Sequence, residues 1–269
     1  MAPTPADLLA AAQRSLQAAG SRDRAGWVGL FADGGRIEDP VGSRPHFGAQ
    51  QIERFYDTFI GPRQISFRGD MDVVAGTTVI RDLELQVTMA PKRNPEKTGT
   101  VTMCIPAYLR YALTPDLRIA ELQAYWELPT MVGQFLRSGV AALPAGIQLA
   151  GTLLRNQGFA GVVGFAAGFR GPGRAGKRLF TRLLDELCVG NEVAVRRRLA
   201  GDVAVHAGEN RPLVVSQLIE LCAGATWCKP VASGYSVVAR LETERNRAVL
   251  IADLTPNPLA VGRLRCFVE

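Results

Sequence analysis

The stretch RIEDPVGSRPHFGAQQIERFY, from Arg36 to Tyr56, decides the fold of the first half of this chain. The acidic pair Glu38 and Asp39 stands directly before Pro40, at the end of a short strand-like segment. A Gly-Ser-Arg-Pro turn follows, and then a helix with apolar side chains on one face. This order leaves two interpretations of Asp39 open: a pocket carboxyl that moves protons, or a polar residue that caps a turn.

The composition is that of a globular protein with room for two domains. The chain has 269 residues, of which 47% are hydrophobic and 21% charged, so it can bury a sizeable core. Its net charge is +6, but the basic residues are spread along the chain without interleaved aromatic residues, so we expect no nucleic-acid partner. Five cysteines without a CxxC pair and two histidines predict no metal site, no cofactor and no disulfide framework.

The N-terminus has no signal-peptide pattern, which predicts a cytoplasmic protein. Residues 131–169 are rich in Ala, Gly, Leu and Val, but their longest uncharged run falls short of the ~18–20 residues of a spanning helix. The basic segment 170–178 could contact acidic lipid headgroups. Peripheral membrane contact through 131–178 therefore stays open beside a solvated linker.

The first half predicts three helices and then an antiparallel meander. The expected elements are helices over 4–20, 24–31 and 48–60, a brief strand at 36–39, and strands over 64–67, 79–89, 101–111 and 117–126. Such an order calls for a curved sheet wrapped over helices, with a pocket between them.

The second half repeats this order of elements. Its segment LLDELCVGNEVAVRRRLAGDVAVHAG parallels LQAAGSRDRAGWVGLFADGGRIEDPVG of the first half. We therefore expect an α+β protein of two tandem copies of one fold. The expected division is a first domain over 1–128, a helical Gly/Ala-rich connector over 129–176, and a diverged second domain over 177–269.

The run GLFADGGRIEDPVGSRPHFGAQQIERFYDTF resembles the equivalent segment of bacterial Δ5-3-ketosteroid isomerases, within the SnoaL-like and NTF2-like cone fold. The resemblance extends more faintly to about residue 127. It implies two tandem cone folds, the first with an apolar pocket where a carboxylate removes a proton beside a carbonyl and donors stabilise the dienolate oxygen.

The resemblance assigns site residues by position. It implies that Asp39 is the general base, that Tyr56 supports the oxyanion donor, and that Trp126 is an aromatic pocket wall. Trp27 and Phe55 face inward on their helices and are expected to contact the ligand.

Both direct oxyanion donors depart from the pattern. The helix tyrosine is replaced by Ser15, and the strand aspartate by Ala107. Losing one such donor typically costs about 10²–10³ in rate. Tyr108, Tyr111 or Ser15 could substitute, although Tyr108 would point away from the face of Ala107 in a regular strand.

In the second copy the position of Asp39 falls at His206 or Ala207, and the EDP run is absent. A histidine there could act as a base or be structural. We expect this copy to be mainly structural or partner-binding.

The leading hypothesis is a protein that binds a steroid or similar apolar carbonyl compound and isomerises it weakly. The alternatives are a non-catalytic carrier or sensor of hydrophobic ligands, acting at a membrane surface in one version, and a structural dimerising module. A homodimer is left open.

Overall fold

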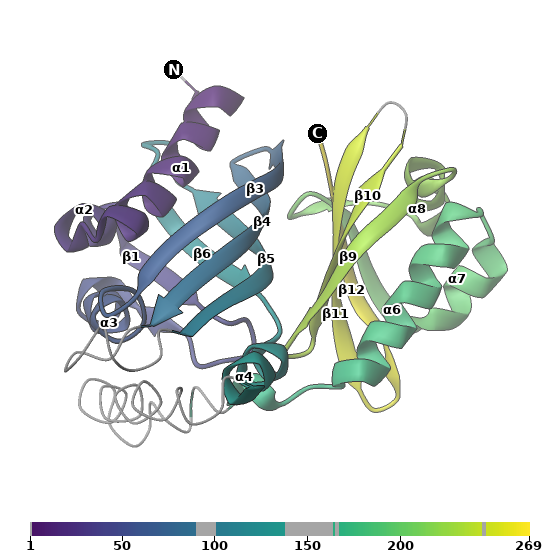
Figure 1. Ribbon diagram of the computed structural model, residues 1–269. Coiled ribbons are helices and arrows are strands. Elements are labelled where there is room, and N and C mark those ends of the chain that lie inside the picture. The colour runs from purple at the N-terminus through teal and green to yellow at the C-terminus, as the bar shows by residue number, and fades with distance from the viewer. Residues whose placement is uncertain (1, 90–100, 138–163, 165–166, 244–245) are drawn as a thin grey trace.

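The computed structural model describes residues 2–89, 101–137, 164, 167–243 and 246–269. Within this part the strands form two six-stranded sheets, and each sheet carries helices on the face turned away from the other sheet (Figure 1). The protein is thus an α+β fold of two layered halves, as the sequence predicts.

The first half begins with helices and continues into a meander. Its helices are α1 (Pro5–Ser21), α2 (Arg24–Gly29), α3 (Gly48–Phe55) and the π-helical turn η1 (Tyr56–Ile60). Its strands are β1 (Phe31–Glu38), β2 (His46–Phe47), β3 (Gln64–Ala75), β4 (Thr78–Met89), β5 (Val101–Leu113) and β6 (Ile119–Tyr125).

Helix α1 begins at a capping box. Thr4 accepts a hydrogen bond from the backbone N–H of Asp7, and the Asp7 carboxylate accepts one from the N–H of Thr4. The helix ends at Arg22, whose left-handed backbone closes the last turn. Its buried face carries mostly small side chains, namely Leu8, Ala11, Ala12, Ser15, Leu16 and Ala19.

The first sheet has the strand order β2-β1-β6-β5-β4-β3. Strands β1 and β6 run parallel, and the other neighbours run antiparallel. Strand β3 reaches Ala75, well past the expected end at residue 67. The polar run Arg68–Asp70 hides this continuation, because a bulge between Gly69 and Met71 interrupts the alternation of inward and outward side chains.

The second half repeats this arrangement. The connecting helix α4 (Leu128–Arg137) and the short turn η3 (Ala167–Phe169) precede it. Its helices are α6 (Gly173–Cys188), α7 (Glu192–Arg198) and α8 (Val215–Cys222). Its strands are β7 (Leu199–Ala207), β8 (Arg211–Pro212), β9 (Thr226–Ser233), β10 (Ser236–Glu242), β11 (Arg247–Pro256) and β12 (Leu259–Val268).

The second sheet has the order β8-β7-β12-β11-β10-β9, which matches the first sheet strand for strand. The parallel pair β7–β12 takes the place of β1–β6. Strand β9 has no clear signal in the sequence, because Lys229 and Pro230 in its middle are typical of a loop. With β9 included, both halves have the same order of elements, as the tandem repeat requires.

The two sheets pack against each other through the faces that carry no helices among the described residues (Figure 1). A buried apolar cluster joins them, made of Val41, Met71, Val73, Ile80, Tyr108 and Tyr125 from the first half and Val231, Val238, Val249, Ile251 and Phe267 from the second. The Tyr108 hydroxyl donates to the carbonyl of Lys229 at 3.0 Å. The two copies therefore form a face-to-face pair within one chain.

Charged groups are buried in the same layer. The side chain of Asp82 is fully buried and forms ion pairs with Lys229 and with Arg240, the latter at 3.1 Å. Burial raises the pKa of the Asp82 carboxyl, against the two cations that lower it. Glu209 of the second half binds Arg110 of the first at 2.6 Å. These pairs fix one relative register of the two sheets.

The expected connector lies largely outside the described residues, and with it most of the segment 131–178 for which peripheral membrane contact was left open. Within the described part of the chain, no helix is both long and apolar enough to cross a membrane.

Candidate functional site

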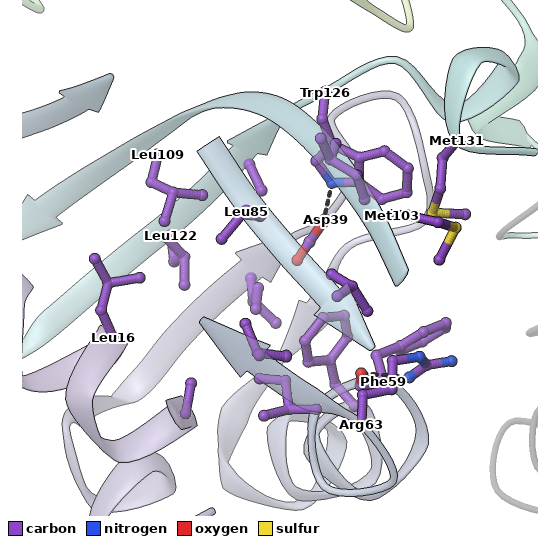
Figure 2. Close-up of a pocket in the computed structure, with 18 of the residues that line it drawn as sticks. Leu16, Asp39, Phe59, Arg63, Leu85, Met103, Leu109, Leu122, Trp126 and Met131 are labelled. Carbon is purple, nitrogen blue, oxygen red and sulfur yellow. Dashed lines mark hydrogen bonds between the residues drawn. The ribbon is translucent and has the colours of Figure 1, made fainter. Parts of the chain in front are cut away.

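A cavity of about 230 Å³ lies between the concave face of the first sheet and helices α1, α3 and α4 (Figure 2). This is far more than the roughly 10–15 Å³ that one water molecule needs. Its wall is mostly apolar: Leu16, Ala19, Trp27, Ile37, Phe55, Phe59, Ile60, Ile65, Leu85, Val87, Met89, Met103, Ile105, Leu109, Leu122, Ala124, Trp126, Met131, Val132 and Phe135. The remaining lining residues are Ser15, Asp39, Arg63 and Tyr111.

Asp39 lies between the two ends of this cavity. In Figure 2 its carboxylate has Leu16, Leu109 and Leu122 on one side and the two labelled methionines on the other. Asp39 follows the last residue of β1, where Glu38 pairs with Gln123 of β6. Because β1 pairs with β6 up to Glu38, the next residue, Asp39, lies at the cavity wall.

The turn after Asp39 is tied to both halves of the protein. The N–H of Val41 donates to the carbonyl of Ala124 at 2.8 Å, and the carbonyl of Val41 accepts a hydrogen bond from the Ser233 hydroxyl at 2.9 Å. Between β6 and α4, the side chain of Glu127 accepts a hydrogen bond from the N–H of Ala232 at 3.2 Å. The second half therefore supports the backbone on either side of the site.

Trp126 orients the Asp39 carboxyl. The indole Nε1–H donates to Asp39 Oδ1 at 2.5 Å, drawn as the dashed line in Figure 2. Trp126 comes directly after β6 and is 8% exposed, so the indole is held by the core around it. A single donor of this kind fixes a carboxylate without neutralising it.

The environment favours the protonated form of Asp39. Burial raises the pKa of Asp39 to about 6, while the Trp126 hydrogen bond and the charge of Arg63 lower it. The carboxyl touches the cavity and is otherwise surrounded by protein, which accounts for the size of the effect. A carboxyl with this pKa can both take and return a proton near neutral pH.

Arg63 is a cavity residue that sequence reasoning missed. Its guanidinium Nη1 donates to the carbonyl of Thr58 at 2.9 Å and to that of Phe59, and its Cζ lies 5.7 Å from the centre of the Phe59 ring. Burial lowers the pKa of Arg63 to about 10, partly offset by the charge of Asp39. The sequence offers one indication of this position: Arg63 is a single basic residue between Pro62 and the first long strand.

Tyr111 and Ser15 lie together at the wall formed by β5 and α1. Tyr111 is fully buried, and burial raises its pKa to about 12, while the nearby Ser15 hydroxyl lowers it. Within the described residues, the Tyr111 hydroxyl has no partner that meets hydrogen-bond geometry. It therefore remains protonated beside the cavity, with the Ser15 hydroxyl close to it but outside hydrogen-bond geometry.

The structure brings Ser15, Trp27, Phe55 and Trp126 together with Asp39 around the cavity. Trp27 stacks on Phe55 with ring centres 6.2 Å apart, which forms one aromatic wall.

Tyr56 and Ala107 are not among the lining residues. Tyr56 packs on Trp27 at 5.5 Å between ring centres, and its buried hydroxyl has no hydrogen-bond partner in the described part of the chain. Ala107 is buried in the same core, opposite Leu83 of β4. A catalytic role of Tyr56 and a ligand contact of Ala107 stay predictions.

The strand pairing identifies the equivalent of Asp39 in the second half. Ile37 pairs with Leu122 in the first sheet, and Val205 pairs with Leu264 in the second. Counting two residues on from each, Asp39 corresponds to Ala207. His206 then corresponds to Glu38 on the outward face, and its ring Nδ1 is buried without a hydrogen-bond partner among the described residues.

The helices extend this equivalence. Asp23 and Asn191 are the N-caps of α2 and α7, so Ser15 corresponds to Leu183 and Trp27 to Val195. Leu183 is fully buried in the second core. The small residue beside the first cavity is thus replaced by a large apolar one.

Among the described residues, no group of three or more His, Cys, Asp or Glu side chains could hold a metal ion.

Comparisons with known proteins agree with the geometry of the first half. The Nuclear transport factor 2 (NTF2) domain family matches residues 8–102. The first half thus resembles the NTF2-like superfamily, with the curved sheet and helical cover described above.

Similar solved structures match about half of the chain. A Mycobacterium tuberculosis protein in complex with estradiol-17beta-hemisuccinate is 23% identical over 46% of this chain and 95% of its own, with a TM-score of 0.40. The Delta 5-3-ketosteroid isomerase of Mycobacterium sp. is 25% identical over 46% of this chain and 95% of its own, with a TM-score of 0.40. An LEH-like epoxide hydrolase of M. tuberculosis is 17% identical over 52% and 98%, with a TM-score of 0.43.

Proposed function

We propose that the first half binds a steroid or similar apolar carbonyl compound, and that Asp39 moves a proton on it. The observation that carries this proposal is the Asp39 carboxyl itself, with a pKa raised to about 6 inside an otherwise apolar cavity. A buried carboxyl in an apolar pocket costs stability, and such groups gather at functional sites.

The reaction needs one base acting twice. The Asp39 carboxylate takes a proton from the carbon beside the ligand carbonyl, and the C–H electrons pass into the conjugated system to give a dienolate. The protonated Asp39 then returns the proton two carbons further along. The double bond moves into conjugation with the carbonyl, and the carboxylate is regenerated.

The surroundings of Asp39 favour this proton transfer. Trp126 holds one carboxylate oxygen at 2.5 Å, which leaves the other free to face the ligand. The apolar walls exclude water, so a proton taken from carbon stays on the carboxyl until it is returned. The resemblance of the surrounding sequence to ketosteroid isomerases supports the same assignment.

A second candidate is a carrier that binds the same compounds without turning them over. Ser15 and Ala107 favour it, because they stand where ketosteroid isomerases have their direct oxyanion donors. A pocket that keeps its base and loses its donors would retain affinity for apolar ligands while losing most of its rate.

One assay separates the two candidates. The purified full chain is given 5-androstene-3,17-dione, and the absorbance of the conjugated enone is followed over time. If Asp39 is the base, Asp39→Asn lowers the rate by about 10²–10⁴-fold. Asp33→Asn, at a fully exposed aspartate of the same half, is the matched control and leaves the rate unchanged.

The pH profile provides an independent check. Because the base must be ionised, the wild-type rate rises with pH through about 6 and levels off above it. Turnover equal in wild type and Asp39→Asn would contradict the catalytic role. Steroid binding without turnover would establish the carrier, and no binding would refute both candidates.

A further inference from the structure

The Tyr111 hydroxyl is a donor without a partner at a cavity wall. Tyr111 lies on β5, on the face that also carries Met103, Ile105 and Leu109 toward the cavity. The side chain is fully buried, and no described residue satisfies its hydroxyl. Leaving a buried donor unsatisfied costs about 1–3 kcal/mol, so such groups call for a ligand or solvent partner.

The position of Tyr111 relates it to the base. Tyr111 pairs with Leu122 of β6, and Ala124 of the same strand lies beside Asp39 through the turn hydrogen bond to Val41. Both Leu122 and Ala124 line the cavity. The hydroxyl and the carboxyl thus flank two neighbouring inward residues of one strand, and Tyr111 is on the side of Leu122, away from α4.

Ser15 adds a second hydroxyl at the same place. It faces the cavity from α1, near enough to Tyr111 to influence the titration of the phenol. Burial keeps the phenol protonated at neutral pH, so it can donate a hydrogen bond. Tyr108, by contrast, lies on the opposite face of β5 and donates to Lys229 between the sheets.

We infer that Tyr111, with Ser15 beside it, is the hydrogen-bond donor that recognises the oxygen of a ketone ligand in this cavity. The inference rests on the proposed function and adds the orientation of the ligand: its oxygen points to the β5–α1 wall and its apolar body extends toward α4. This donor stands four residues along β5 from Ala107, so it does not replace the lost aspartate at its own position.

The test uses two ligands that differ in one oxygen, 5α-androstan-3-one and 5α-androstane. Binding to the full chain is followed by the fluorescence of Trp27 and Trp126, which line the cavity. Wild type should bind the ketone about 3- to 10-fold more tightly than the hydrocarbon, the range of one net hydrogen bond. Tyr111→Phe should abolish this preference and leave hydrocarbon binding unchanged.

Tyr108→Phe is the matched control, because it removes the same group from the opposite face of the same strand. It should retain the ketone preference. Thermal unfolding of the free proteins is a second readout: Tyr111→Phe should lose no stability, because its hydroxyl has no protein partner within the described residues.

The outcomes separate the two proposals. A wild type that prefers the ketone, with a Tyr111→Phe variant that keeps the full preference, would overturn the donor role and leave the proposed function intact. Equal affinity of wild type for both ligands would also overturn it. If wild type binds neither ligand, the proposed function falls and takes this inference with it.

Discussion

The two halves of this chain share one frame and differ in what fills it. Among the described residues, both have three α-helices, a parallel strand pair and an antiparallel meander in the same strand order. At equivalent positions, Asp39 of the first half becomes Ala207 of the second, and Ser15 becomes Leu183. The apolar pattern therefore determines the fold, while a few side chains determine whether the fold holds a cavity and a titrating group.

The first helix of each half explains the difference in filling. Helix α1 turns small side chains to its sheet, including Ala12, Ser15 and Ala19. Helix α6 turns Phe180, Leu183 and Leu187 to the second sheet, all fully buried. Large side chains close the space that small ones leave open. The second half has the composition of a packed core at the site where the first half has a cavity.

The largest predicted effect concerns the layer that joins the halves. Asp82→Ala removes the fully buried carboxylate shared by Lys229 and Arg240 and leaves these cations with their partly exposed partners Asp70 and Glu242, so we expect a loss of about 3 kcal/mol. Chemical denaturation of the full chain measures it. Asp70→Ala, whose partly exposed carboxylate meets the same lysine at 3.4 Å, should cost less than about 1 kcal/mol. Equal losses would mean that the buried pair does not couple the halves.

The second prediction compares equivalent helix positions. Leu183→Ala creates a void in a packed core and should cost about 2–5 kcal/mol. Ser15→Ala changes a small side chain beside an existing cavity and should cost below about 0.5 kcal/mol. Both values come from urea unfolding midpoints at constant slope. A similar cost at both sites would contradict the contrast between a filled and an open core.

The smallest predicted stability effect concerns Asp39 and pH. The folded-state pKa of about 6 lies above the unfolded value of 3.8, so the folded protein holds the proton more tightly. Wild type should therefore lose on the order of 2–3 kcal/mol of stability as pH rises from about 4 to about 6, and keep that deficit above it. Asp39→Asn lacks this deficit and should be the more stable protein at pH 7.

Unfolding free energies of wild type and Asp39→Asn at pH 4 and pH 7 test this sign. Ala207→Asn places the same amide at the equivalent position of the second half and should give no gain. A wild type that gains stability on Asp39 ionisation would refute the buried-carboxyl description.

Sequence reasoning reached the elements with local signals. The first helix and the strand that ends beside Asp39 each depend on residues close together in the chain, and each lies where the local pattern places it. The local pattern could not decide whether His206 or Ala207 corresponds to Asp39. That correspondence depends on the register between β7 and β12.

What the sequence could not predict depends on contacts between distant segments. Strand β9 contains Lys229, a residue type that is not typical of a strand interior. Its charge is paired with Asp82 of the other half, a contact that the local sequence does not show. Arg63 and the α4 residues Met131 and Phe135 reach the cavity through the tertiary arrangement, without a motif of their own. The position of the Tyr111 hydroxyl likewise depends on how β5, β6 and α1 pack together, which the sequence does not show.

The support that Val41 and Glu127 receive from β9 has a consequence for how the site responds to dilution. If the second sheet belonged to a separate polypeptide, the turn beside Asp39 would keep its brace only above the dissociation constant of the pair. Here Ser233 and Ala232 are tethered to the residues they hold, and their effective concentration is set by the chain itself. The second half thus acts as a permanent subunit that braces the turn beside Asp39 at any protein concentration.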